Sequence, residues 1–177
     1  MTKSSACSSA VSAVSAVLVL VLTACGPDPA GAPSSADGGI PERTSISPFD
    51  DEHPALSRLD PALLRAVQQA AGAARADGVE LKVTSGWRSK DYQQRLLAAG
   101  VEKYGSLARA REFVNTPEKS THVSGQAVDI GPTDAADWVV RHGSDHGLCQ
   151  TYANEMWHFE LRTTPGGDCP VPSSDAG

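Results

Sequence analysis

The sequence has no cluster of lysine and arginine, although 15 of its 177 residues are one of these two. Aspartate and glutamate number 21, so the formal net charge at pH 7 is -6. A protein that binds nucleic acid needs grouped cations against the phosphates, and we therefore set this class aside. The composition, with 40% hydrophobic and 20% charged residues, is that of a globular protein.

The chain also lacks an apolar run of the roughly 20 residues that a membrane-spanning helix needs. Its most apolar stretch, AVSAVSAVLVLVLTA at 10–24, is shorter than this and follows a positive start at Lys3. Such an arrangement is typical of a signal peptide. We expect residues 1–24 to be a signal and the mature protein to be exported.

The end of the signal resembles a bacterial lipobox. LTAC spans Leu22 to Cys25, and a lipidated Cys25 would hold the protein at the outer face of the cell membrane. The alternative is an ordinary signal peptide that is cleaved nearby. Residues 25–49 include GPDPAGAPSSADGG, a composition that buries little apolar surface and predicts a flexible, lipid-anchored tether.

Internal repeats are absent, which leaves one folded domain over 50–170 and a tail over 171–177 that we expect to fray. The domain contains Cys149 and Cys169, whose spacing is not that of a CxxC metal knuckle. In an exported domain, two such thiols most simply form a disulfide. The bridge would close a loop of about 20 residues and stabilise the fold by roughly 3 kcal/mol.

Hydrophobic periodicity and capping residues predict helices that alternate with short strands. The clearest helix begins at Asp60, an N-cap residue, with Pro61 at N1, and it ends near Gly78. We expect further helices over 89–100, 106–114 and 134–143, and strands over 79–86, 126–132 and 156–162. This order predicts an α+β fold, with helices packed around a small, mostly antiparallel sheet.

The segment STHVSGQAVDI, residues 120–130, contains the residue types of a nucleophilic triad and also those of a metal site. A serine nucleophile is usually presented on a sharp turn such as G-x-S-x-G, beside an oxyanion hole. Ser120 has no such turn glycines, and nothing near it marks an oxyanion site. The serine-hydrolase interpretation is therefore disfavoured.

A metal site would combine His122 and Asp129 with a ligand from elsewhere, because catalytic zinc usually has three protein ligands and one open position. NEMWHFEL at 154–161 supplies His158 as the third ligand. A metal ion lowers the pKa of its bound water to about 7. Glu155 is the candidate general base for that water.

Strand alternation tests this arrangement. If the two strands are neighbours, Asp129 and His158 can face one ion. Glu155 must then lie in the turn before the second strand, and Glu160, on the face of His158, is the competing base. Each histidine taken alone would more simply form a surface pair with a carboxylate. The remaining histidines belong to no such group and are read as solvated: His53, His142 and His146.

Three motifs occur in order along the domain: SGWRS at 85–89, STHVSGQAVD at 120–129 and NEMWHFE at 154–160. Together they resemble the zinc D-alanyl-D-alanine carboxypeptidases of VanY and VanX type, in which S-x-H-x-x-G-x-A-x-D is followed by E-x-W-H. The resemblance covers about residues 55–165. It implies the small α+β fold that these peptidases share with Hedgehog signalling domains.

The resemblance implies a role for the main polar residues of these motifs. His122, Asp129 and His158 would bind Zn²⁺, and Glu155 would be the general base. Arg88 would donate a hydrogen bond to the scissile carbonyl oxygen and strengthen its hold as the oxyanion develops. Without the family, a surface salt bridge is the simpler interpretation of this arginine.

The resemblance also implies a substrate. The family removes the C-terminal D-alanine of peptidoglycan stem peptides, and an anchored domain would lie near the growing cell wall. Ser120 and Gln93 would either hydrogen-bond this substrate or orient the site, and Trp157 would either line the pocket or pack in the core. Alternatives that fit the same scaffold are an LD-carboxypeptidase, a cross-bridge endopeptidase and a non-catalytic lipoprotein that binds the cell wall.

Overall fold

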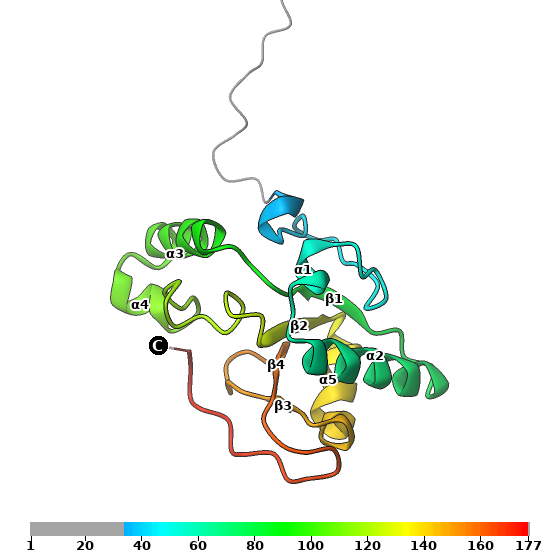
Figure 1. The fold of residues 1–177 in the computed structure, drawn as a ribbon. Helices are drawn as coiled ribbons and strands as arrows, with labels where there is room; N and C mark the ends of the chain where they lie inside the picture. Colours follow the sequence, from blue (N-terminus) through cyan, green and yellow to red (C-terminus); the bar gives the residue numbers. More distant parts are fainter. Residues whose placement is uncertain (1–33, 177) are drawn as a thin grey trace, which may run out of the picture.

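The structure is a computed structural model that describes residues 34–176 of the chain. The expected signal peptide, residues 1–24, and the lipidation site Cys25 lie outside these residues. The described chain forms a small sheet flanked by helices (Figure 1). Within this part of the chain, no helix is both long enough and apolar enough to cross a membrane.

Four short strands form one sheet in the order β1-β2-β4-β3. They are Lys82–Ser85 (β1), Ala127–Gly131 (β2), Leu148–Gln150 (β3) and His158–Leu161 (β4). All three neighbouring pairs are antiparallel, so the expected α+β fold with a small antiparallel sheet is confirmed. The sequence does not predict β3, because three residues are too few to show an alternating pattern.

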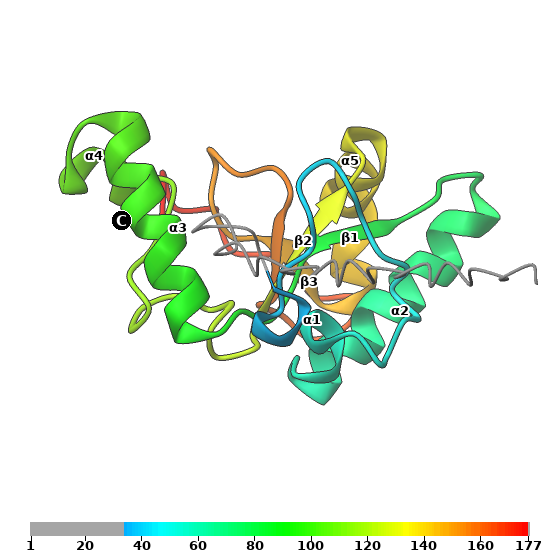
Figure 2. The same ribbon diagram turned by 90° about the horizontal axis from the view of Figure 1, so that it is seen from above.

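The helices form two groups around this sheet. They are Pro54–Ser57 (α1), Pro61–Ala76 (α2), Lys90–Tyr104 (α3), Leu107–Arg111 (α4) and Thr133–His142 (α5), with 3-10 turns at Ser35–Asp37 (η1) and Gly143–His146 (η2). α2 contacts α5, and these two helices pack on β3 and β2. α3 and α4 pack on each other and lie well apart from α2 and α5 in both views (Figures 1 and 2).

α2 supplies much of the core. Asp60 caps its first turn, as expected, because the carboxylate accepts hydrogen bonds from the backbone N–H groups of Ala62 (2.7 Å) and Leu63 (3.4 Å). The largest fully buried side chains around its apolar face include Leu63, Val67, Val83, Val128, Ile130 and Phe159. Side chains alternate along a strand, so burying Phe159 in this core turns its neighbour His158 to the opposite face.

α3 extends beyond the end that the sequence predicts at Gly100. It continues to Tyr104, where Gly105 (φ 81°) forms the cap and its N–H donates to the carbonyl of Val101 at 2.9 Å. A Cβ on Gly100 would lie 3.4 Å from the Cβ of Ala110 on α4. The predicted end is wrong because this glycine serves close packing of α3 against α4 rather than termination of the helix.

The described part of the expected tether packs on the domain. Ile40 is 7% exposed, and Ile46 forms a backbone bridge to β1. Asp37 pairs with Arg95 of α3 at 2.8 Å. The prediction of a flexible tether is therefore wrong for residues 34–49, because the two isoleucines supply apolar burial that the Gly- and Pro-rich composition obscures.

Two links hold the C-terminal part of the chain. Cys149 of β3 and Cys169 form the expected disulfide, with their Cα atoms 5.6 Å apart. Beyond the disulfide, Ser173 forms a parallel backbone bridge with Tyr152. The tail that the sequence places at 171–177 is therefore tied to the domain at Ser173, where we expect fraying from its composition alone.

Candidate active site

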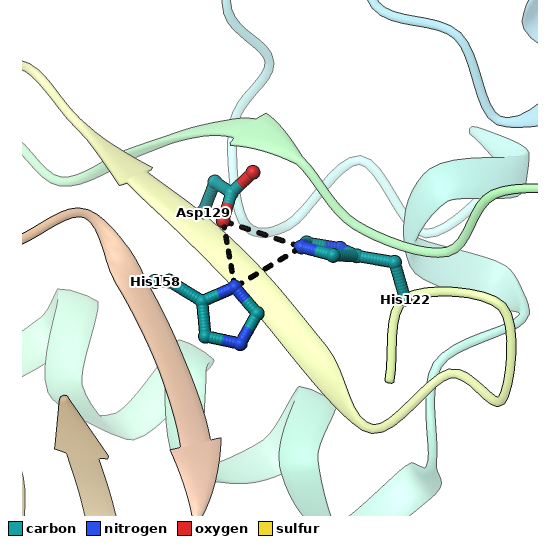
Figure 3. A group of neighbouring side chains, drawn as sticks. All are labelled: His122, Asp129 and His158. Carbon is teal, nitrogen blue, oxygen red and sulfur yellow. Dashed lines mark hydrogen bonds and ion pairs between the residues drawn. The ribbon is translucent and has the colours of Figure 1, made fainter. Parts of the chain in front are cut away.

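The side chains of His122, Asp129 and His158 converge on one point (Figure 3). Nε2 of His122 lies 3.2 Å from Nδ1 of His158. Each of these nitrogens lies 3.3 Å from Oδ1 of Asp129. All three side chains are buried. The three atoms form a nearly equilateral triangle, which we call the ligand cluster.

The sheet brings two members of the ligand cluster together. Asp129 on β2 and His158 on β4 are direct partners in the antiparallel register, as strand alternation predicts. His122 comes from the turn before β2, in which Gly125 has a φ of 73°. A Cβ on Gly125 would lie 2.5 Å from the carbonyl oxygen of Arg58, so the turn can pass this close only with glycine.

Hydrogen bonds on the outer edges of the two imidazole rings fix their tautomers. Nδ1 of His122 lies 2.8 Å from the carbonyl oxygen of Gly86, so this nitrogen carries the proton and donates it. Nε2 of His158 lies 3.0 Å from Oε1 of Glu160. Each ring therefore points the lone pair of its other nitrogen into the ligand cluster, as metal-binding histidines usually do.

The ligand cluster has the dimensions of a tetrahedral zinc site. Zinc bonds to nitrogen and oxygen of about 2.0–2.2 Å place neighbouring ligand atoms about 3.3–3.6 Å apart, and the edges of the triangle are 3.2 and 3.3 Å. Oδ1 of Asp129 is buried and makes no hydrogen bond in the structure. Such an orphaned carboxylate oxygen is costly unless a cation satisfies it, so the residues present fit Zn²⁺.

The protonation states of His122 and Asp129 suit a metal, whereas His158 must lose a proton to bind one. Burial and the nearby Arg88 guanidinium together lower the pKa of His122 to about 4, against the opposing effect of Asp129, so the ring is neutral at pH 7. Burial alone would raise the pKa of Asp129, but His122, His158 and Arg88 hold it well below its usual range. Burial alone would lower the pKa of His158, but Asp129 and Glu160 raise it to about 9 in the metal-free protein. A neutral imidazole and an ionised carboxylate are the forms that ligate zinc.

Glu155 lies in the turn before β4, where the sequence predicts it. Its Oε2 is 3.7 Å from Nδ1 of His158, beside the ligand cluster. Burial raises the pKa of Glu155 to about 7, against the opposing effect of His158. A carboxyl group that titrates near neutral pH can both accept and return a proton.

Glu160, the competing base, faces away from the cluster. It contacts Nε2 of His158, on the opposite edge of the ring from the ligand nitrogen, and Arg162 binds its other oxygen at 3.3 Å. The geometry therefore favours Glu155 as the base and gives Glu160 a supporting position behind His158.

Arg88 is held beside the cluster by three side chains. Its Nε donates to Oγ of Ser85 (2.8 Å), one terminal nitrogen donates to Oε1 of Gln93 (3.1 Å), and the other donates to Oδ2 of Asp129 (2.9 Å). Gln93 is 1% exposed, and its amide nitrogen binds the carbonyl of Asn115 at 2.8 Å. Gln93 is therefore placed to hold Arg88, which matches the second of its two expected roles, orientation of the site; a contact of Gln93 with substrate stays a prediction.

A cleft of about 420 Å³ opens over the ligand cluster, with Glu155, Arg88 and Ser120 in its lining. Trp157 also lines it and is 44% exposed, so the alternative that Trp157 packs in the core is wrong. Trp157 precedes the first residue of β4, and for this reason it does not follow the alternation that buries Phe159.

The cleft also contains residues that the three motifs do not include. Tyr104 at the end of α3 and Phe113 after α4 stack with their ring centroids 4.6 Å apart, and both line the cleft with Tyr152. The sequence predicts Phe113 on a helix and Tyr104 between two helices, and it indicates a place in the site for neither residue. Their position in the cleft depends on how the α3–α4 pair packs in the tertiary structure.

A known protein family matches most of this domain. Its model, described as VanY, D-alanyl-D-alanine carboxypeptidase, matches residues 56–163. The chain belongs to the VanY family. This match confirms the resemblance carried by the three motifs, and it spans the ligand cluster and Glu155.

One curated relative of this VanY-family chain is a D-alanyl-D-alanine carboxypeptidase of Enterococcus faecalis. The two are 28% identical over 127 residues, which cover 58% of this chain and 47% of the relative. The chain thus spans about half the length of the curated relative that it matches.

Solved structures share the fold. A mutant of the vancomycin resistance D,D-pentapeptidase VanY from a VanB-type resistance cassette, in complex with Zn(II), is 28% identical, with a TM-score of 0.55 over 58% of this chain and 71% of that chain. VanYB in complex with D-alanine-D-alanine is 25% identical, with a TM-score of 0.57 over 69% and 80%. The LD-carboxypeptidase LdcB is 26% identical, with a TM-score of 0.51 over 58% of each chain.

The solved neighbours and the ligand cluster both indicate the same cofactor, a zinc ion. The first solved neighbour contains Zn(II), and the His–Asp–His group of this chain has the residue types and spacing of a zinc site. The expectation of Zn²⁺ as the cofactor is confirmed.

Proposed function

We propose that this VanY-family protein is a zinc-dependent carboxypeptidase that removes the C-terminal D-alanine from D-alanyl-D-alanine ends of peptidoglycan stem peptides. The observation that carries the proposal is the position of Glu155, a buried carboxylate in the cleft and 3.7 Å from the ligand cluster. A protein that only binds the cell wall has no use for a base at this position.

In the proposed mechanism, His122, Asp129 and His158 hold the zinc ion. When bound, the ion supplies a Lewis acid that lowers the pKa of water to about 7 and polarises the scissile carbonyl. Glu155 accepts the proton of the attacking water. It then returns this proton to the departing amino group of D-alanine, so one carboxyl group serves as base and acid in turn.

Arg88 stabilises the negative charge that develops on the carbonyl oxygen. Its three side-chain partners engage three of its five N–H groups, so donors remain for substrate. Because Ser85, Gln93 and Asp129 already fix the guanidinium, it needs little rearrangement when the charge appears. Ser120 and Trp157 line the cleft and are the proposed contacts for the rest of the peptide.

The comparisons support a D-alanyl-D-alanine substrate and leave one alternative specificity, that of an LD-carboxypeptidase. The family description names this dipeptide, and VanYB was solved with D-alanine-D-alanine. The LD-carboxypeptidase LdcB is similar at a comparable TM-score of 0.51. An LD-carboxypeptidase that acts on a tetrapeptide stem is therefore the second candidate.

We also propose that the protein is exported and anchored through a lipid on Cys25 at the outer face of the membrane. The disulfide between Cys149 and Cys169 supports export, because such bonds persist in oxidising compartments. Metabolic labelling with a fatty-acid analogue tests the anchor. Label should be incorporated into the wild-type protein and not into the Cys25→Ala variant.

Incubation of the zinc-loaded protein with defined muropeptides tests the activity. We expect D-alanine release from a pentapeptide stem that ends in D-alanyl-D-alanine, its loss with a chelator and its return with added Zn²⁺. Faster release from a tetrapeptide stem would favour the LD-carboxypeptidase, and cleavage only of cross-linked dimers would favour an endopeptidase. Failure to cleave any of these substrates would leave wall binding as the function.

A further inference from the structure

The C-terminal segment 170–176 is joined to the loop between β3 and β4. The N–H of Ser173 donates to the carbonyl of Thr151 at 2.9 Å, and the N–H of Ala153 donates to the carbonyl of Ser173 at 2.7 Å. The two bonds form a parallel bridge between Ser173 and Tyr152. The segment is thus tied to this loop by one isolated β-bridge.

The loop carries Glu155 and is otherwise supported mainly by polar contacts. The N–H of Glu155 donates to the carbonyl of Tyr152 at 3.2 Å, and the side-chain amide of Asn154 donates to the carbonyl of Glu112 at 2.9 Å, after α4. Ala153 and Asn154 are exposed. Met156 at the end of the loop packs against the core, and the ring centroids of Tyr152 and His158 lie 4.9 Å apart. The exposed middle of the loop, Ala153 and Asn154, therefore depends most on its few hydrogen bonds.

The same segment forms part of the cleft wall. Ala176 lines the cleft together with Glu155, Asn154 and Phe113. In both views, the red end of the chain lies beside α4, although the two segments are far apart in the sequence (Figures 1 and 2). The segment therefore runs past the Glu155 loop toward the α3–α4 pair.

A covalent bond fixes the start of the segment. Cys169 is bonded to Cys149 of β3, three residues before Tyr152, where the bridge to Ser173 forms. The segment lies outside residues 56–163, which the family model matches. The shared catalytic domain of the family therefore does not account for it.

We propose that residues 170–176 are a positioning segment that holds the β3–β4 loop so that Glu155 stays beside the ligand cluster. The proposal rests on the hydrolytic function proposed above. A misplacement of about 1 Å at a reacting group can cost on the order of 100-fold in rate. The two bonds of the bridge go to Thr151 and Ala153 and not to Asp129 or His158, so we expect the loss of the bridge to lower turnover without weakening zinc binding.

A proline at position 173 tests the proposal. Ser173→Pro removes the N–H that binds Thr151, whereas Ser173→Ala keeps both backbone bonds and is the matched control. In zinc-loaded protein, we expect kcat of the proline variant to fall about 10-fold or more, with unchanged zinc affinity and an intact disulfide. The alanine variant should match wild type. Equal kcat in all three proteins, or a parallel loss of zinc, overturns the proposal.

Hydrogen exchange separates this proposal from the hydrolytic function on which it rests. Ser173→Pro should speed amide exchange in the 151–157 loop and leave exchange in β2 unchanged. A chain that ends at Pro170 should do the same without any new side chain. Wild-type protein that cleaves no stem peptide but shows this exchange pattern would refute only the hydrolytic function. Unchanged exchange in both variants refutes the positioning role, whatever the activity.

Discussion

Glu160 and Asp129 lie at opposite edges of the same imidazole ring. Nε2 of His158 lies 3.0 Å from Oε1 of Glu160, and Nδ1 lies 3.3 Å from Oδ1 of Asp129. Arg162 holds the second oxygen of Glu160 at 3.3 Å. Glu160 therefore keeps the proton of His158 on Nε2 and leaves Nδ1 free to bind the metal.

Loss of Glu160 should weaken zinc binding. Replacing a carboxylate behind a metal-binding histidine typically costs 10- to 100-fold in affinity, so we expect a loss of about this size in Glu160→Ala. Competition with a chromophoric chelator measures it. Glu160→Gln retains an oxygen acceptor and should keep most of the affinity. Wild-type affinity in the alanine variant would show that the contact does not orient His158.

Replacing Glu155 should separate catalysis from metal binding. Glu155→Gln preserves the shape of the side chain but removes the base, so we expect kcat to fall by about 10²–10⁴. Zinc content and the melting temperature should stay close to wild type. Glu80→Gln, at an exposed ion pair with Lys82, is the control and should retain full activity. A Glu155→Gln enzyme with normal turnover would falsify the assigned base.

The pH profile should report the ionisation of Glu155. It acts as a base only when ionised, so kcat/KM should rise with pH through its pKa and then level off. Burial raises the pKa of Glu155 to about 7 in the metal-free protein. A bound zinc ion favours the carboxylate, so the inflection of the zinc-loaded enzyme should lie below this value. Activity that increases toward acid pH would argue for a different base.

The N–H donors of Arg88 should contribute more to kcat than its positive charge does. Arg88→Lys keeps the charge, but lysine cannot bind Ser85, Gln93 and Asp129 at once in a planar fork. Loss of one oxyanion donor costs about 10²–10³ in rate, and we expect a loss of kcat of this order. Gln93→Leu removes one support of the guanidinium and should cost less. Steady-state kinetics with a pentapeptide stem would compare kcat of the two variants. A larger loss of kcat in Gln93→Leu than in Arg88→Lys would contradict the role of Arg88 as the oxyanion donor.

Gly125 should be required for the turn that carries His122. Gly125→Ala forces a Cβ to 2.5 Å from the carbonyl oxygen of Arg58 at a positive φ, so we expect a lower melting temperature and weaker zinc binding. Gly72 in α2 has nothing within 4 Å of its Cβ position. Gly72→Ala should therefore leave zinc binding intact and stabilise the protein by about 0.5–1 kcal/mol. Similar behaviour of the two variants in thermal unfolding would contradict this explanation.

The ligand cluster is predictable from the sequence because each step depends on local rules. Alternation along two strands places Asp129 and His158 on one face, and their pairing then needs only that β2 and β4 be neighbours. Glu155 falls in the turn because it stands three residues before His158. The tautomers are not predictable, because Gly86 and Glu160 reach the rings only through the tertiary fold.

Other features depend on contacts that composition conceals. Ile40 and Ile46 lie in a Gly- and Pro-rich stretch, yet both pack against the domain. Gly100 stands at a helix contact rather than a helix end. The bridge at Ser173 uses backbone groups, so the type of side chain at this position does not predict it. In each case, long-range packing overrides a local preference.

If Cys25 carries the proposed lipid, the packing of residues 34–49 limits how far the active site can lie from the membrane. With an anchor at Cys25, only the eight residues 26–33 separate the lipid from the packed body. A fully extended chain spans at most about 3.6 Å per residue, so residues 26–33 can span about 29 Å at most. A free tether to residue 49 would reach about three times as far. Under the proposed anchoring, the cleft would be confined to a thin shell above the bilayer, and stem peptides deeper in the wall would lie beyond its range.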